Sequence, residues 1–410
     1  MFGTEKTMKL VEQPPILGEQ VPLSRKKKLF FDSVSILFVL VVLACLGELV
    51  VRVLPLGKYR SAPFRQYDPE IGLSLIPNKH VIHSRGCFQG EVSINRWGMR
   101  DRERSLEKPP GEFRIAMIGD SGVEAVQVKP DEVVNIRMEN VLHDIGYNSV
   151  EVMNFAVEGI GTTQEFLLYK QKVRQFHPDL VLLMFTLGND IFNNSSTLQP
   201  KVYGIHDWYS PYYGLALDGS LVFKPVQPRS FNKLRLYLET HSLLFYYLQR
   251  LWFKFNIPLH TWHRLPLYYG IYSDPLDDEW RQAWQVTGKV LALMQDTVTA
   301  DGAKFMVFSG PDICDDRDWH QRLTKEYGKV PPSFRPCSAV QRLKETAATH
   351  HIQLDFLGPY IHAYGDQHHL PWPYFSFTCD PHFNALGHEV SAEAIVQILR
   401  ERNLLPVQRP

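Results

Sequence analysis

The chain has 410 residues, long for a single domain, and its 44% apolar and 21% charged residues are ordinary for a protein with a full hydrophobic core. Lys plus Arg and Asp plus Glu both number 44. This balance, without a long basic stripe after residue 28, argues against a nucleic-acid partner.

An apolar segment near the N-terminus predicts a membrane-spanning helix. Residues 33–47 carry no charge, and their flanks extend the apolar stretch to residues 29–54. A spanning helix needs roughly 20 residues, which this stretch exceeds. A buried core helix and a cleaved lipoprotein signal before Cys45 are alternatives, but Leu43 is a poor residue two positions before such a cysteine. We therefore expect a signal anchor over 29–54, preceded by a cytoplasmic tail over 1–28.

The charges around this anchor favour one orientation. The basic run Arg25–Lys28 precedes it, which favours a cytoplasmic N-terminus. Basic residues also follow it, but a large domain is translocated largely regardless of flanking charge. We expect a single-pass protein of the cytoplasmic membrane, with its large domain on the periplasmic or extracellular side.

The cysteines fit an exported domain, because that compartment permits disulfides. Four cysteines allow three pairings, and the sequence does not choose among them. They contain no Cys-x-x-Cys pair, so we do not expect a zinc site. The pairs His260/His263 and His368/His369 have no acidic or cysteine partner at ligand spacing, so we expect no other metal, and we expect no cofactor. The four cysteines are Cys87, Cys314, Cys337 and Cys379.

After the anchor, residues 55–112 form an extended lead-in, and residues 113–410 form the main domain. In this domain apolar strands alternate with amphipathic helices, which predicts a parallel sheet with right-handed crossovers. We predict an α/β fold of three α/β/α layers around a flavodoxin-like sheet of about five strands. The strands are predicted at 113–119, 149–157, 179–190, 304–310 and 352–358, and the helices at 131–146, 162–176, 277–298, 339–351 and 385–403.

Local signals predict where two of these helices begin and end. Asp131 is placed to cap the first helix, and Gly146 to end it. The second helix should begin at Thr162 or Thr163, ahead of Gln164.

An insertion of about residues 191–303 separates the third strand from the fourth. Residues 216–225 predict a hairpin that turns at Asp218-Gly219. Residues 242–255 predict a helix that is apolar nearly all the way round. We expect a buried lid or core helix there; the alternative is a surface that touches the membrane or a partner.

Residues with catalytic potential follow several of the predicted strands. This position is informative because open parallel sheets bind their ligands beyond the carboxyl ends of the strands. Ser121 follows the first strand, Gly159 the second and Asn189 the third. Asp380 and His382 follow the fifth strand and a long loop, just before the last helix. One edge of the sheet is therefore expected to collect these five residues.

Together these residues suit acyl transfer. His382 can take the proton of the Ser121 hydroxyl, and Asp380 can orient the imidazole. The backbone N–H groups of Ser121 and Gly159 and the side-chain amide of Asn189 can donate to a tetrahedral oxyanion. Glycine at position 159 allows close approach of the backbone, where a side chain would block the pocket.

The sequence resembles the SGNH (or GDSL) hydrolases, within them the bacterial membrane-anchored kind, over about residues 68–405. The matching blocks are "IGDS", "NFAVEGIGTTQE", "PDLVLLMFTLGND" and "DPHFNALGH". The resemblance implies Ser121 as nucleophile, Gly159 and Asn189 as oxyanion donors, and His382 with Asp380 as the base. Cys379 stands where many members carry an acid three residues before the histidine, so the acid must be Asp380. After the nucleophile the family's usual Ser-x-Thr-x-Gly reads "SGVEAV".

We therefore expect a membrane-anchored serine esterase or O-acyltransferase that acts on an acyl ester, such as an acetyl group on an envelope polysaccharide. Water or a sugar hydroxyl would release the acyl group from Ser121. The alternative is a catalytically silent subunit of the same fold that binds or assembles an envelope complex through a protein partner.

Overall fold

The computed structural model describes residues 24–53, 63–203, 210–226, 230–256 and 265–407. The chain divides into two units, Met1–Leu54 and Pro55–Pro410. Each unit is described by itself.

The described part of the first unit, residues 24–53, contains one helix, α1, which spans Arg25–Val53. It is long and apolar enough to cross a membrane, and none of its residues is buried. It is therefore not a core helix, whereas a signal sequence at the N-terminus would have the same length and composition. Most of the predicted tail, residues 1–23, lies outside the described part of the chain.

The second unit is built on five parallel strands in the order β11-β10-β7-β5-β6. Numbered along the chain from the β6 edge, this order is 2-1-3-4-5, the flavodoxin-like arrangement that the sequence predicts. All residues of β7, at the centre, are buried, as expected for a strand covered on both faces. The strands are β5 (Phe113–Gly119), β6 (Val150–Asn154), β7 (Leu180–Phe185), β10 (Lys304–Ser309) and β11 (Leu354–Phe356).

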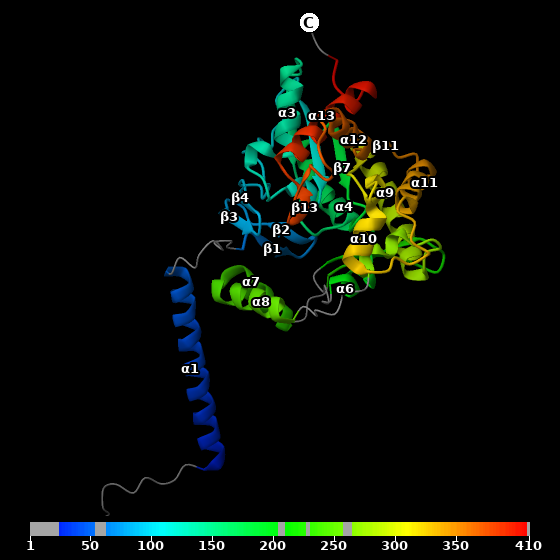
Figure 1. Ribbon diagram of the computed structural model, residues 1–410. Coiled ribbons are helices and arrows are strands. Elements are labelled where there is room, and N and C mark those ends of the chain that lie inside the picture. Colours follow the sequence, from blue (N-terminus) through cyan, green and yellow to red (C-terminus); the bar gives the residue numbers. More distant parts are fainter. Residues whose placement is uncertain (1–23, 54–62, 204–209, 227–229, 257–264, 408–410) are drawn as a thin grey trace, which may run out of the picture. The chain divides into compact units, whose positions relative to one another are not determined.

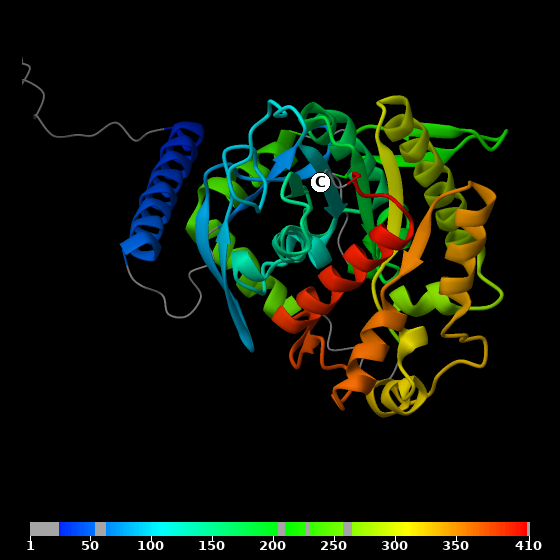
Figure 2. The same ribbon diagram turned by 90° about the horizontal axis from the view of Figure 1, so that it is seen from above.

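Helices cover both faces of this sheet, which confirms the three-layer α/β/α prediction (Figure 1). Side chains alternate along β5: Ala116 and Ile118 belong to one hydrophobic cluster, whereas Ile115 and Met117 belong to the other. Figure 2 shows α13, in red, beside α3 on one face. That face carries α3 (Val134–Asp144), α12 (Gly358–Gln367) and α13 (Ala385–Glu401), and the other carries α4 (Thr162–Gln171), α9 (Asp278–Ala300) and α11 (Ser338–Thr349).

The predicted helix boundaries hold in part. Gly146 lies just beyond α3 with φ +95°, so its role in ending the helix is confirmed. Asp131 as the cap is wrong: it lies in a separate 3₁₀ turn, Pro130–Glu132, because the Glu132 carboxylate accepts from the Lys129 N–H and closes that turn. The helix α4 does begin at Thr162.

The insertion between β7 and β10 contains two kinds of structure. The hairpin of β8 (Tyr212–Leu215) and β9 (Leu221–Lys224) is confirmed, with Gly219 at φ +81° in its turn. The remaining described elements of the insertion are helices. They are α5 (Asp190–Asn193), α6 (Leu198–Tyr203), α7 (Ser230–His241), α8 (Leu243–Asn256), a 3₁₀ helix at Leu267–Tyr272, and α9.

The expectation of a core helix over residues 242–255 is wrong. None of the α8 side chains that the structure describes is buried. The physical reason is that α8 packs against α7 instead of beneath the sheet, so its neighbours cover only part of it. The two helices lie side by side in Figure 1.

The lead-in consists of two antiparallel strand pairs, joined to the sheet by buried arginines. The Arg104 guanidinium is fully buried and donates to Asp101, to Glu139 of α3 and to the Val152 carbonyl of β6. A buried network of charges such as this one stabilises the fold only while every charge keeps its partner. The strand pairs are β1 (Arg65–Asp68) with β2 (Gly72–Leu75) and β3 (His80–Arg85) with β4 (Phe88–Ser93).

Replacing Arg104 by Leu should lower the free energy of unfolding by about 3–5 kcal/mol, because Asp101 would stay buried without its cation and Glu139 would keep only the more exposed Arg102 as a partner. Urea denaturation of the purified chain measures this change. The matched control is Arg96→Leu, which removes the exposed pair with Glu103 and should cost less than about 1 kcal/mol. Equal losses in the two variants would contradict the role of Arg104.

Candidate active site

Ser121 lies at the carboxyl end of β5, at the first residue of a four-residue helix, α2 (Ser121–Glu124). Asp120 caps this helix, because its carboxylate accepts from the Gly122 N–H at 3.0 Å. The side chain of Ser121 is thereby held at the end of a buried strand, where it is half-buried and not enclosed in the core.

The structure brings Ser121, His382 and Asp380 into one hydrogen-bonded chain. His382 Nε2 lies 2.7 Å from Ser121 Oγ, across 261 residues of sequence. His382 Nδ1 contacts Asp380 Oδ1, which also accepts from the His382 N–H at 3.1 Å. A serine hydroxyl, an imidazole and a buried carboxylate in this order form the arrangement in which the imidazole can take the hydroxyl proton.

Local strand geometry explains why an Asp-x-His spacing suffices. Asp380 and His382 lie in a short strand, β13 (Asp380–Phe383), which pairs with β12 (Ser376–Phe377). Residues two apart in a strand point to the same side. The Asp380 side chain is only 2% exposed, whereas that of His382 is 23% exposed, so the carboxylate is shielded and the imidazole is accessible.

Gly159 lies in the loop after β6, which is bonded to the end of β5. The Val157 N–H donates to the Gly119 carbonyl at 3.2 Å, which sets this loop beside the loop of Ser121. Gly159 has φ +83°, and a Cβ there would meet nothing within 4 Å. Its need for glycine is therefore conformational, and it differs from the close packing expected from the sequence.

Asn189 lies in the turn after β7, directly before α5, and its side chain contacts Asp120, which caps the helix of Ser121. Its Nδ2 donates to Asp120 Oδ2 at 2.6 Å, and Thr186 Oγ1 donates to the other oxygen of Asp120 at 3.1 Å. An amide nitrogen carries two hydrogens. One hydrogen of the Asn189 amide is used in the bond to the Asp120 carboxylate, and this bond orients the Asn189 side chain beside Ser121.

A carboxylate cluster that the sequence reasoning missed binds the two backbone loops together. Arg65 of β1 contacts Glu124 of α2 at 2.6 Å and Glu158, the neighbour of Gly159, at 2.5 Å. Glu124 also accepts from the Glu158 N–H. Burial raises the pKa of Glu124, and the charge of Arg65 opposes that rise. The lead-in thus helps to position the loop of Gly159 against the helix of Ser121.

Further titratable groups that the sequence reasoning did not single out lie buried near the site. Burial, together with the charges of Asp190 and Asp120, raises the pKa of Glu165 well above its usual range. Burial lowers the pKa of His388 to about 3, so its imidazole stays neutral at physiological pH. No single-sequence signal distinguishes them from surface residues, because their burial depends on packing between helices and loops.

Two disulfides are present, and one of them reaches the site. Cys87, at the β3–β4 turn, pairs with Cys379, which directly precedes Asp380. Cys314 pairs with Cys337. The structure thereby selects one of the three pairings that the sequence left open, and it places a crosslink directly beside Asp380.

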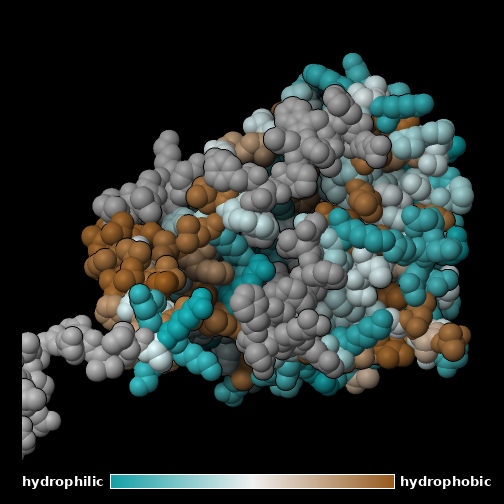
Figure 3. All heavy atoms as spheres, turned by 90° about the horizontal axis from the view of Figure 1, so that it is seen from below, coloured by the Kyte–Doolittle hydropathy of each residue, from teal (hydrophilic) through white to brown (hydrophobic). Residues whose placement is uncertain are grey.

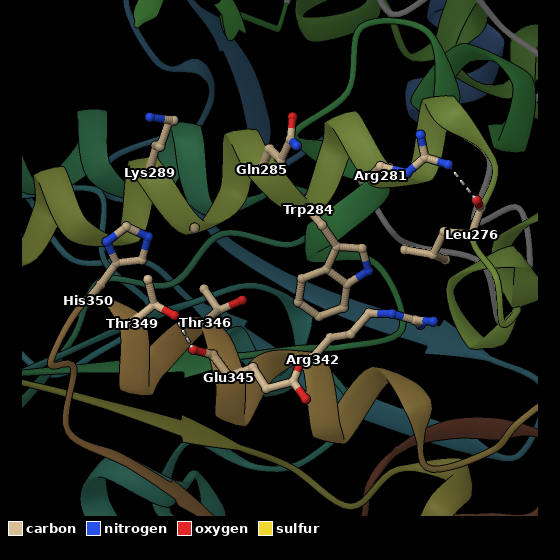
Figure 4. A pocket seen from close by; sticks show the side chains of 11 residues that line it. Leu276, Arg281, Trp284, Gln285, Lys289, Arg342, Glu345, Thr346, Thr349 and His350 are labelled. Atoms are coloured by element: carbon tan, nitrogen blue, oxygen red, sulfur yellow. Dashed lines mark hydrogen bonds between the residues drawn. The ribbon is translucent and has the colours of Figure 1, made fainter. Parts of the chain in front are cut away.

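A separate hollow lies between α9 and α11 and contains none of the predicted site residues. Its volume is about 420 Å³. Figure 4 shows Trp284 of α9 directed towards α11, above Arg342, with the basic side chains of Arg281 and Lys289 along the α9 rim. The chemistry of the Ser121 site does not involve this hollow.

Comparison with known proteins finds similarity among solved structures, whereas no family model and no curated protein matches the chain. A lipase/acylhydrolase from Enterococcus faecalis is 15% identical, with 71% of this chain and 96% of that chain covered and a TM-score of 0.33. A GDSL-like lipase from Bacteroides thetaiotaomicron is 10% identical, with coverage of 72% and 92% and a TM-score of 0.32. A catalytic mutant of an acetylxylan esterase from Geobacillus stearothermophilus is 12% identical, with coverage of 72% and 96% and a TM-score of 0.37. At such identities and TM-scores, the argument for the chemistry rests on the geometry of the site itself.

Replacing Arg65 by Gln should slow the reaction of Ser121 with a fluorophosphonate about tenfold, because a small displacement of the Gly159 loop weakens stabilisation of the developing negative charge. Rates of covalent labelling, followed by mass spectrometry, measure the effect. Arg317→Gln, which removes an exposed pair with Asp366, is the control and should leave the rate unchanged. An unchanged rate in the Arg65 variant would show that the cluster does not position the loop.

Proposed function

We propose that the protein is a serine esterase or O-acyltransferase of the SGNH type. The observation that carries this proposal is the continuous contact of Ser121, His382 and Asp380 at the carboxyl edge of the sheet. In support, Gly159 and Asn189 lie on the loops that flank Ser121.

In this mechanism Ser121 Oγ attacks the acyl carbonyl carbon while His382 Nε2 accepts its proton. Asp380 stabilises the imidazolium, and the N–H groups of Ser121 and Gly159 with the Asn189 amide donate to the oxyanion. As the tetrahedral intermediate collapses, the leaving alkoxide takes the proton from His382, and the acyl group remains on Ser121. Water or a sugar hydroxyl then attacks, returns its proton through His382, and releases an acid or a new ester.

As the physiological substrate we propose an acyl ester, first an acetyl group on an envelope polysaccharide. The protein would be anchored in the cytoplasmic membrane through residues 29–54, with its domain outside. Two observations support this placement: α1 has the length and apolar composition of a spanning helix, and the domain contains two disulfides, which persist in oxidising compartments.

Ser121→Ala should abolish covalent labelling by a fluorophosphonate and lower turnover of p-nitrophenyl acetate by about 10⁴-fold or more, because no other residue replaces the nucleophile. His382→Ala should suppress both signals to a similar extent, since the two residues act as a unit. Peptide mapping of the labelled chain identifies the modified residue, and thermal unfolding checks that each variant is folded.

Retained turnover in a folded Ser121 variant would contradict the proposal that Ser121 is the nucleophile. An unreactive Ser121 in the folded wild-type chain, together with a stable protein partner, would favour the alternative of a silent subunit that assembles an envelope complex. Adding oligosaccharide acceptors to the acetyl ester assay separates hydrolysis from transfer, because only transfer yields an acetylated sugar.

A further inference from the structure

The α7–α8 pair exposes large apolar side chains that the catalytic site does not use. Each of five residues has at least half of its surface exposed: Leu234 (55%), Tyr237 (59%), Leu248 (53%), Leu251 (50%) and Trp252 (58%). Apolar side chains gathered on one surface of a protein mark a site of interaction.

These side chains occur at helical spacing. On α7, Leu234 and Tyr237 are three residues apart, and on α8, Leu251 and Trp252 follow Leu248 by three and four residues. Residues three and four apart lie on the same face of a helix. Each helix therefore presents one apolar face, and the two helices pack against each other.

Over the rest of the second unit's described residues, exposed large apolar side chains are scattered. They occur as single residues or short pairs on separate elements, such as Ile82, Ile145 and Val407. The brown cluster at the left of Figure 3 belongs largely to α1 of the first unit and is not part of the second unit, whereas hydrophilic side chains, in teal, cover much of the remaining coloured surface. The concentration on α7 and α8 is therefore specific to that pair.

The position of the α7–α8 pair beside β1, the first strand after α1, bears on which partner its apolar surface contacts. Residue Val53 ends α1 and residue Arg65 begins β1, and 65 − 53 = 12 residues reach at most roughly 40 Å. The strand β1 in turn packs against α7. If α1 spans a membrane, the length of this connecting chain, the tether, allows the α7–α8 pair to reach the surface of that membrane.

We propose that the α7–α8 pair docks on the lipid bilayer that holds α1. Leu234, Leu248 and Leu251 enter the boundary between headgroups and acyl chains, as in interfacial helices. Tyr237 and Trp252 suit the same depth, because Tyr and Trp are enriched where a membrane meets water. The tether keeps the surface at a high effective concentration near the bilayer, which favours lipid over a freely diffusing protein partner. This surface does not depend on whether Ser121 is catalytic.

The test uses the full chain with Cys45→Ser, reconstituted into vesicles of phosphatidylethanolamine and phosphatidylglycerol. Single cysteines introduced as Leu234→Cys or Leu251→Cys carry an environment-sensitive NBD probe. The matched control is Gln397→Cys, at an exposed position of α13. We expect blue-shifted emission from the probes at 234 and 251 and quenching by nitroxide lipids labelled near the headgroup, whereas the probe at 397 keeps the emission of a water-exposed group.

Probes at 234 and 251 that remain as water-exposed as the probe at 397 would overturn the proposal. So would a blue shift that requires an added protein or that rises with the density of the chain in the vesicles, since those outcomes indicate a protein partner or a second copy. Failure of the full chain to float with the vesicles would also overturn it, because the tether would be absent. Unchanged thermal unfolding confirms that the labelled variants are folded.

Discussion

The parallel register of β5 with its two neighbours is the constraint on which the candidate site depends. Met117 pairs with Asn154 of β6, and Gly119 pairs with Met184 of β7. The three strands consequently end at one edge, and the residues that follow them lie on adjacent loops. A shift of one residue in either pair would move buried side chains to the wrong face of the sheet and displace those loops.

The site also depends on residues before the first strand of the sheet. Arg100 and Arg104 are buried and bind backbone carbonyls or carboxylates of the main sheet and its helices, while Arg65 contacts carboxylates beside Ser121. A buried guanidinium is costly unless all its partners are in place, so these arginines make the lead-in part of the fold. The Cys87–Cys379 disulfide adds a covalent connection from the lead-in to the strand that carries Asp380.

The insertion between β7 and β10 serves two physical purposes. Its helix α9 completes the hydrophobic layer over one face of the sheet, with Val290 and Met294 buried. The α7–α8 pair contributes little to that layer and instead keeps apolar surface exposed. It packs beside β1, the strand of Arg65, so the proposed membrane contact and the candidate active site share one structural neighbour.

The sequence by itself determined the fold class, because buried strands and amphipathic helices follow local periodicities that a single chain displays. It also singled out Ser121, Asp380 and His382, which the structure brings into contact, although their catalytic role stays a proposal. Only the tertiary structure decided the disulfide pairing, the turn at Asp131, the exposure of α8 and the contacts of Arg65 with Glu124 and Glu158. These features depend on which distant segments pack together, and neither residue type nor spacing along the chain encodes that directly.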